Sequence, residues 1–227
     1  MYICVNKCIM LTHAEENYLK IIYHLSLTEE AGISTNAIAN KMNTKASSVT
    51  DMIKKLSEKE LINYKKYKGV FITQNGKLTA KMIIRKHRLW EVFLVEKLNF
   101  NWDEVHELAE ELEHIKSEKL INALDKFLGF PKEDPHGDPI PNANGEIFVR
   151  EKELLSETQV SKKYMCVGVK DTSSVFLQYL DRQNISLGTS FIVTAIEMFD
   201  QSVSIEVNGN PLTLSKIVAQ NLFVKQI

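Results

Sequence analysis

A group of histidine and glutamate residues lies near the middle of the chain. His106, Glu110, Glu113 and His114 follow one another in an H-x3-E-x2-E-H pattern. On one helix all four side chains would share a stripe, because residues three and four apart lie on the same face. Neutral imidazole and ionised carboxylate are ligands for borderline divalent metals such as Mn, Fe, Co and Zn. The pattern therefore indicates a candidate metal site.

A second pair of the same kind lies upstream. His87 and Glu91 are four residues apart and would also share one helical face. One such pair alone is more often a solvated surface pair than a ligand set. Two such groups, placed after the helix-turn-helix pattern described below, favour the interpretation that metal is bound.

The charge of the chain is uneven, although its total is only −1. Residues 33–90 hold 13 Lys/Arg against 3 Asp/Glu, a net charge of +10, and the rest of the chain carries −11. A basic segment inside a neutral protein is typical of a nucleic-acid-binding module. The alternative is a Lys-rich solvated surface on a helical domain.

The basic segment has the pattern of a winged helix-turn-helix. An amphipathic helix is expected over 17–27, and a short helix then runs from an N-cap at Ser34 or Thr35 to Met42. After a turn, a second short helix is expected over 46–59. Two strands, 61–64 and 70–73, then flank a basic loop that contains glycine, which predicts a wing.

The expected DNA contacts come from the second short helix and from the wing. Small hydroxylated side chains at the start of that helix can approach phosphates and base edges, and lysines can neutralise phosphates. The residues assigned to double-stranded DNA are Lys45, Ser47, Ser48, Thr50, Asp51, Lys54, Lys55, Lys65, Lys66 and Lys68.

The remainder predicts a mainly α protein with a small β part. Long helices are expected over 75–98, 103–119 and onward to 127, and four prolines between 130 and 141 indicate a linker or domain boundary. Alternating apolar residues from about Val160, with one helix over 173–183, predict a small β-barrel. The expected divisions are an N-terminal extension (1–10), a DNA-binding domain (11–84), a helical dimerisation and metal-binding domain (85–150) and a β domain (151–227).

Other classes of protein are disfavoured by the composition. The apolar runs are too short for a membrane span, and the start lacks the pattern of a signal peptide, so we expect a cytoplasmic protein without membrane contact. Three cysteines without framework spacing disfavour a disulfide-stapled domain. Cys4 and Cys8 are interpreted as unpaired thiols of the extension, with metal binding there the less favoured alternative.

Several motifs, taken in order, resemble the diphtheria toxin repressor family of metal-dependent regulators. They are T-x-x-E-E-N-Y-L-K-I-I-Y from Thr12, S-S-V-T-D-M-I-K-K-L from Ser47, R-K-H-R-L-W-E from Arg85, V-H-E-L-A-E-E-L-E-H from Val105 and P-H-G-D-P-I-P from Pro135. The resemblance covers 12–141, and the tail from Val160 resembles the SH3-like domain of that family. It implies a homodimeric repressor of metal-homeostasis genes, activated for operator binding by Mn(II) or Fe(II), with Co, Ni or Zn able to bind in vitro.

The resemblance also implies two metal sites. The ancillary site comprises His87, Glu91 and His106, and the SH3-like domain is expected to add Asp171, or less well Ser174, to it. The primary, regulatory site comprises Glu110, Glu113 and His114, with Asn17 contributing from the first helix.

Three positions depart from the pattern of the family. Asn17 offers only a neutral amide oxygen where the family has Met or Asp. Lys20 stands where manganese regulators have a ligating Glu, which disfavours their closely spaced pair of metals. Glu110 replaces the Cys of iron-type members, and a carboxylate in place of a thiolate favours Mn over softer metals.

Two other functions remain as alternatives. The protein could be a winged-helix regulator that responds to a small molecule or partner, with its His/Glu residues forming only a buried polar network. It could also be a metallohydrolase, because His/Glu clusters can activate water. The absence of H-E-x-x-H, nucleophile-elbow and phosphate-loop motifs disfavours an enzyme.

Overall fold

The computed structural model describes residues 10–29 and 31–227, which form two compact units. The first unit extends to Lys86 and includes Glu113–Lys116 and Pro141–Gly145; the second comprises His87–Leu112, Ser117–Ile140 and Glu146–Ile227. The predictions for Cys4 and Cys8 lie outside the described residues.

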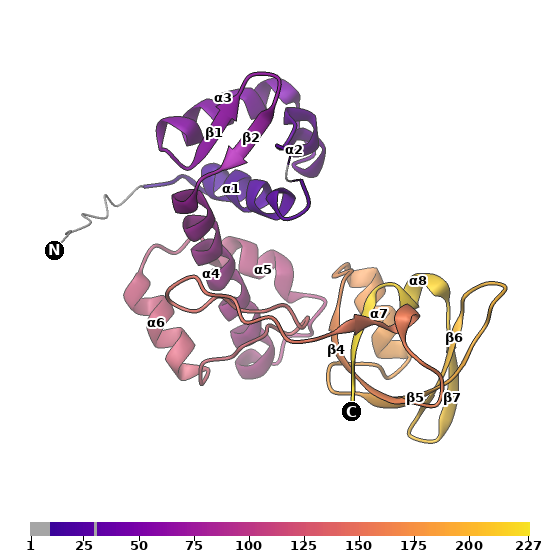
Figure 1. Cartoon of the computed structure of the whole chain (residues 1–227). Coiled ribbons are helices and arrows are strands. Elements are labelled where there is room, and N and C mark those ends of the chain that lie inside the picture. Colours follow the sequence, from indigo (N-terminus) through magenta and orange to yellow (C-terminus); the bar gives the residue numbers. More distant parts are fainter. Residues whose placement is uncertain (1–9, 30) are drawn as a thin grey trace. The chain divides into compact units, whose positions relative to one another are not determined.

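The first unit contains the predicted winged helix-turn-helix (Figure 1). Its elements are α1 (His13–Ser26), α2 (Thr35–Lys41), α3 (Ala46–Glu58), β1 (Ile62–Lys65) and β2 (Gly69–Ile72). Strands β1 and β2 pair antiparallel, and apolar side chains of the three helices and both strands form one core.

Helix α1 begins four residues before the predicted position. The side chain of Thr12 accepts a hydrogen bond from the backbone N–H of Glu15, and the Glu15 carboxylate accepts one from the backbone N–H of Thr12. This capping box satisfies two N–H groups at the end of the helix, so His13 to Glu16 belong to α1. The earlier start gives α1 two further acidic side chains, Glu15 and Glu16.

Three helices follow the wing: α4 (Gln74–Leu98), α5 (Val105–Leu112) and α6 (Glu118–Phe127). The prediction of one helix over 103–119 was wrong, because α5 ends at Leu112 and the chain turns through Glu113 and His114. The side chain of Ser117 then caps α6 by accepting from the N–H of Leu120. Apolar side chains of α4 and α6, with Ile140, form a small core in the second unit.

The proline-rich passage is packed rather than a simple linker. Glu133 bridges to Pro139, and the N–H of Ile140 donates to the carbonyl of Lys132 at 2.8 Å. Asp134, His136 and Ile140 are all buried. This segment is therefore part of the folded second unit and holds Asp134 and His136 in buried positions.

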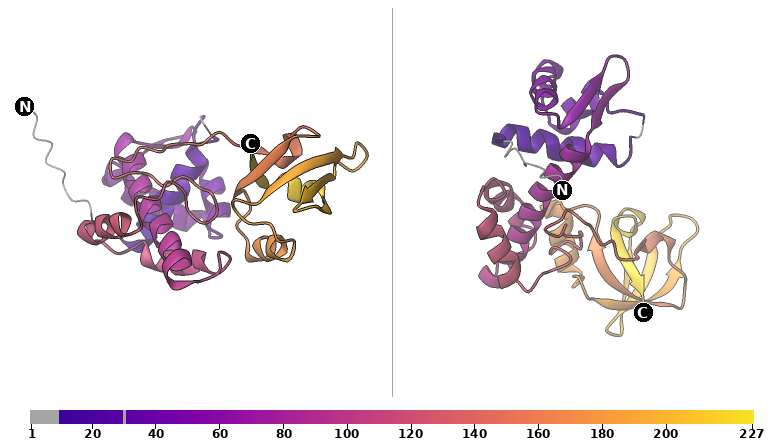
Figure 2. Two further views of the ribbon diagram at one scale, coloured as in Figure 1. Left: turned by 90° about the horizontal axis from the view of Figure 1, so that it is seen from below. Right: turned by 60° about the vertical axis from the view of Figure 1, so that its left-hand side comes forward.

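The C-terminal part is an antiparallel sheet of six strands in the order β3-β8-β4-β5-β6-β7 (Figures 1 and 2). The strands are β3 (Glu153–Leu154), β4 (Lys163–Val169), β5 (Ser190–Ile196), β6 (Val203–Val207), β7 (Asn210–Leu214) and β8 (Leu222–Gln226), joined by η1 (Leu155–Glu157), α7 (Ser174–Arg182) and α8 (Lys216–Ala219). Asn208 and Gly209 both have positive φ in the predicted tight turn between β6 and β7. In the described part of the chain no ladder joins β3 to β7, so the sheet is open, whereas a closed barrel was predicted.

None of the described helices is long and apolar enough to cross a membrane.

Candidate metal centre and nucleic-acid interface

His87, His106 and Glu110 converge in the second unit, next to Glu91. His87 Nε2 lies 3.0 Å from Glu91 Oε1, and His106 Nδ1 lies 3.4 Å from the same oxygen. The Oε1 of Glu110 is 3.9 Å from a ring nitrogen of each histidine. His87, His106 and Glu110 therefore form one group of candidate ligands from α4 and α5, and Glu91 contacts both of its histidines.

Glu91, Asp134 and His136 form a second group whose members are all buried. His136 Nδ1 lies 3.8 Å from Glu91 Oε2 and 4.0 Å from Asp134 Oδ1. The two oxygens of Glu91 thus face different groups, Oε1 toward His87 and His106 and Oε2 toward His136. Glu91 is the residue that joins the two sets of candidate ligands.

The electrostatics of Glu91 match a buried ligand. Burial alone would raise its pKa, but hydrogen bonds with His106, His136 and His87 hold the pKa of this carboxyl well below its usual range. An ionised carboxylate with only 3% of its side chain exposed requires positive charge or donors around it. Protonated imidazoles can supply that charge, and so can a metal ion bound by neutral imidazoles.

The pKa of Asp134 is shifted in the opposite direction to that of Glu91. Burial, together with the nearby charge of Glu91, raises its pKa to about 7, against the opposing effect of Arg88. The Oδ1 of Asp134 accepts from the backbone N–H groups of His136, at 2.8 Å, and Asp138, at 3.0 Å. This turn holds the carboxylate toward the group, where a cation would favour its ionised form.

His136 is oriented by the loop before α5. Its Nε2 lies 2.8 Å from the carbonyl oxygen of Trp102, and the two rings stack at an interplanar angle of 11°. A carbonyl can only accept, so Nε2 carries the proton and Nδ1 presents its lone pair toward Glu91 and Asp134 when the ring is neutral. Metal-binding histidines are commonly oriented by such a contact on the other nitrogen.

Gly137 allows this segment to lie against β4. Its φ is +81°, and an added Cβ would lie 2.1 Å from the carbonyl oxygen of Val167. The N–H of Val169 donates to the carbonyl of His136 at 2.9 Å. A side chain at residue 137 would push His136 away from Glu91.

The sequence analysis missed Asp134 and His136. They lie in no helix or strand, so no periodicity marks them, and the prolines around them suggested a linker. The P-H-G-D-P-I-P motif, which includes His136, was the available signal. With them, the donor set comprises three imidazoles and three carboxylates, a combination that suits Mn(II), Fe(II), Co(II) and Zn(II).

The other predicted ligands lie elsewhere. Glu113 and His114 belong to the first unit and lie in the turn after α5, whereas Glu110 belongs to the second unit. The Nζ of Lys20 contacts both carboxylate oxygens of Glu113 at 2.8 Å, and His114 Nδ1 lies 2.5 Å from Glu16 Oε2. Glu113 and His114 are therefore engaged with side chains of α1.

The structure also gives the surroundings of three further predicted ligands, Asn17, Asp171 and Ser174. The amide oxygen of Asn17 is buried and has no hydrogen-bond partner among the described residues. Asp171 Oδ1 accepts from the backbone N–H of Ser173 at 2.9 Å, just before α7, and the Ser174 hydroxyl donates to the carbonyl of Asp103. Asp171 is a member of neither ligand group.

The predicted DNA-contacting side chains of α3 are on the exposed face of that helix. Val49, Ile53 and Leu56 point into the core of the unit. Lys45, Ser47, Ser48, Thr50, Asp51, Lys54 and Lys55 are exposed. The apolar face therefore fixes the helix, and the polar face is free to meet a ligand.

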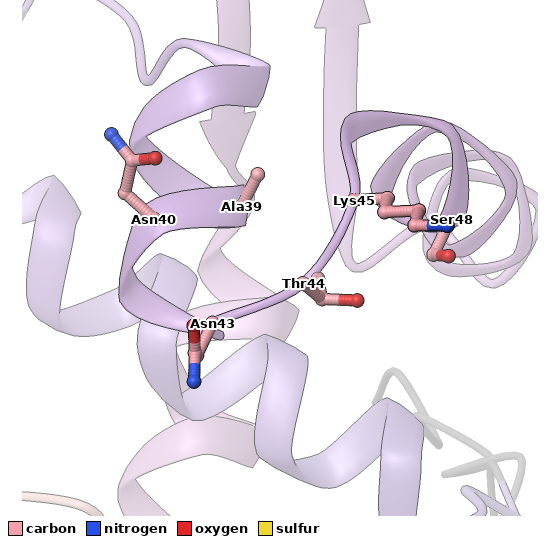
Figure 3. Close-up of a pocket in the computed structure, with 6 residues that line it drawn as sticks. All are labelled: Ala39, Asn40, Asn43, Thr44, Lys45 and Ser48. Carbon is pink, nitrogen blue, oxygen red and sulfur yellow. The ribbon is translucent and has the colours of Figure 1, made fainter.

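An open hollow of about 490 Å³ lies at the start of α3 (Figure 3). It is lined by Ala39, Asn40, Asn43, Thr44, Lys45 and Ser48, and Figure 3 shows polar groups from α2, the turn and α3 around it. Lys45 is the N-cap residue of α3, and because an ammonium cannot accept a hydrogen bond, its side chain does not cap the first N–H groups of that helix. Backbone N–H groups of a helix start attract anions such as phosphate. Asn40, Asn43 and Thr44 were not among the predicted contacts.

The end of β1 and the loop that follows it carry the lysines of the wing. Lys65, Lys66 and Lys68 are exposed, and Tyr67 between them is 91% exposed. Lys66 lies over the Tyr67 ring, and Lys65 lies over Phe71. The wing thus presents three cations and an aromatic ring on a short ribbon.

Three family models match the chain in succession. Residues 10–70 match the iron dependent repressor N-terminal DNA binding domain. Residues 73–142 match the iron dependent repressor metal binding and dimerisation domain, and residues 154–226 match the FeoA domain. The FeoA match covers the part that was predicted to be SH3-like.

Relatives with names and solved structures point the same way. An HTH-type transcriptional regulator of Methanocaldococcus jannaschii is 35% identical over 118 residues, 52% of this chain and 94% of that protein. The iron-dependent repressor IdeR of Mycobacterium tuberculosis is 32% identical over 133 residues, 58% of this chain and 56% of IdeR.

The structure of a manganese-dependent transcriptional repressor in complex with manganese superposes with a TM-score of 0.81 at 32% identity, covering 94% of this chain and all of that one. ScaR with bound zinc gives a TM-score of 0.73 at 35% identity, covering 94% of this chain and 99% of that one. The motifs, the two ligand groups and these matches agree, and the chain belongs to the iron-dependent repressor family of metal-dependent transcriptional regulators.

Proposed function

We propose that this chain is a homodimeric repressor that binds a double-stranded operator when Mn(II) or Fe(II) occupies the centre around Glu91. The observation that carries the proposal is the position of Glu91, whose two oxygens face two groups of histidines and carboxylates. The protein acts on chromosomal DNA in the cytoplasm and is not an enzyme. Its regulated genes are those of metal homeostasis.

The ligands come from both groups. They are His87, Glu91, His106 and Glu110, extended by Asp134 and His136. Carboxylate oxygens and imidazoles without a thiolate favour Mn(II) over softer metals. The manganese named for one solved relative is consistent with this choice.

Lysines and small polar residues bind the operator. Lys54, Lys55 and the wing lysines neutralise phosphates, while Ser47, Ser48 and Thr50 approach base edges at the start of α3. Lys45, Asn43 and Thr44 line the hollow at that end of the helix, which suits a phosphate oxygen.

The dimer forms through the helices of the second unit. Leu98, Phe100, Leu120 and Phe127 are between 38% and 64% exposed at the end of α4, just after it, and on α6. Exposed apolar groups of this size are typical of an interface between proteins. Sedimentation of the purified protein measures whether two chains associate.

Metal regulates binding by linkage. The ion favours whichever conformational state holds its ligands together, and DNA affinity rises if that state also fits the operator. A coupling of about 1 to 3 kcal/mol corresponds to a change of roughly 5- to 150-fold in operator affinity.

The test is the affinity of the protein for DNA fragments selected from the chromosome in the presence of Mn(II). Fluorescence anisotropy is measured with Mn(II) and with a chelator, for the wild type, Glu91→Gln and Glu96→Gln. Glu96 is an exposed carboxylate on α4, paired with Lys97, and it serves as the matched control. We expect metal to raise affinity at least tenfold in the wild type and in Glu96→Gln but not in Glu91→Gln. Equal affinity of the wild type with and without metal would contradict the proposal and favour a regulator that responds to another ligand.

A further inference from the structure

A buried cluster of charges lies in the first unit, outside the centre around Glu91. Both oxygens of Glu113 contact Lys20 Nζ at 2.8 Å. The side chain of Glu113 is 0% exposed and that of Lys20 is 12% exposed. His114 lies against Glu16 at 2.5 Å, and Lys86 Nζ is 3.7 Å from the other oxygen of Glu16. All five residues belong to the same compact unit.

The charges of this cluster balance without a metal. Two carboxylates, Glu16 and Glu113, face two ammonium groups, Lys20 and Lys86. A divalent cation at this place would have to displace an ammonium group that already contacts both oxygens of Glu113.

We propose that Lys20 is the resident cation of this cluster, tying α1 to the turn Glu113–Lys116 without a metal. Glu113 and His114 then act as positioning residues for α1 and are not metal ligands. This inference goes beyond the proposed function, because that function concerns the metal centre around Glu91. The ion pair between Lys20 and Glu113 is instead expected to persist whether or not metal is bound.

The position of Lys20 on α1 explains how its ammonium group can take the place of a metal ion beside Glu113. It lies four residues after Glu16 and seven after His13, so the three side chains share one face of α1, and the His13 ring stacks on His114 at 4.1 Å. Removing the ammonium would take away the cation that contacts both oxygens of the fully buried Glu113 carboxylate, a costly change. A protein that lacks Lys20 is therefore expected to recruit another cation from solution.

The first experiment counts manganese. Wild type, Lys20→Met, K20M/E113Q and the exposed control Lys41→Met are equilibrated with Mn(II), desalted and measured by elemental mass spectrometry. We expect K20M to hold one more ion per chain than the wild type, and K20M/E113Q and K41M to hold the wild-type number. The inference is overturned if K20M gains no ion, or if K20M/E113Q holds fewer ions than the wild type, because Glu113 would then bind metal in the natural protein.

A second measurement needs only the wild type, so it remains decisive if K20M fails to fold. Hydrogen exchange is followed by mass spectrometry with and without Mn(II). We expect the protection of α1 and of 113–116 to be the same in both states. Protection of these segments that develops only with metal would overturn the inference. If instead the proposed function fails, the wild type binds no manganese around Glu91, yet the additional ion in K20M is still expected.

Discussion

The indole Nε1 of Trp102 donates to both carboxylate oxygens of Asp181, at 3.0 and 3.1 Å. Trp102 lies in the loop before α5, and Asp181 lies on α7 of the FeoA domain. Next to it, Gln178 donates to Asp103 at 2.7 Å. Because the carbonyl of Trp102 also contacts His136, one residue links α7 to a candidate ligand.

This link predicts that Asp181→Ala weakens metal binding without touching a ligand. Losing the carboxylate frees the Trp102 indole, and the loop that orients His136 becomes less fixed. We expect the affinity for Mn(II) to fall by about tenfold, the lower end of the effect of contacts that orient metal ligands. Isothermal titration calorimetry measures the affinity. Asp200→Ala is the control, because Asp200 is an exposed aspartate of the same domain that contacts only Ser202 in the described structure. Equal affinities for D181A and D200A would refute the link.

The two ligand groups predict different consequences for two histidines. His136→Ala removes a buried candidate metal ligand that lies opposite Glu91 Oε2. We therefore expect the loss of one bound Mn(II) per chain, or an affinity for Mn(II) that is at least tenfold weaker. His24→Ala removes an exposed histidine at the end of α1 and should leave the metal content unchanged. Electron paramagnetic resonance of free Mn(II) measures both. If H136A binds manganese as the wild type does, the buried group is only a polar network.

The difference between what the sequence predicted and what the structure adds is clearest in this centre. His87 and Glu91 were predicted because both lie on one regular helix, where a spacing of four residues implies contact. The same rule was misleading for Glu113 and His114, because α5 ends at Leu112 and the rule holds only inside a helix. The capping of α6 by Ser117 was the local signal for that interruption.

Other features depend on contacts between distant segments. His136 reaches Glu91 across 45 positions of the sequence, through a turn that Gly137 and the carboxylate of Asp134 define. The pairing of Lys20 with Glu113 spans 93 positions. Spacing along one element carries no information on such pairs, whereas the winged helix-turn-helix and the strands of the FeoA domain follow from local periodicity and turns.

The wing predicts a specific salt dependence of operator binding. Replacing Lys65, Lys66 and Lys68 by alanine removes three exposed cations from one ribbon. Each phosphate that is no longer neutralised should reduce the slope of log affinity against log salt by about 0.9. Anisotropy titrations over a range of salt concentrations measure the slope. Lys162, Lys163 and Lys170, three exposed lysines of the FeoA domain, replaced together, give the matched control with the same change of net charge. A slope that falls equally in both triple variants would contradict a role of the wing in binding phosphate.

Cys166 is predicted to be chemically inert in the folded protein. Its side chain lies on β4 in the core of the FeoA domain, and burial raises the pKa of its thiol to about 11, although a hydrogen bond with the backbone of Gly168 opposes the shift. At about pH 8 roughly one thiol in a thousand is then ionised, and the thiolate is the reactive form.

In a protein with Cys4→Ser and Cys8→Ser, we expect iodoacetamide to label Cys166 at least about 100-fold more slowly when folded than in concentrated guanidinium chloride. Ser186→Cys, at an exposed position of the same domain, serves as the positive control and should be labelled at nearly the unfolded rate. Rapid labelling of Cys166 in the folded protein would mean that this core opens readily, because an intact core leaves the thiol both protonated and out of reach.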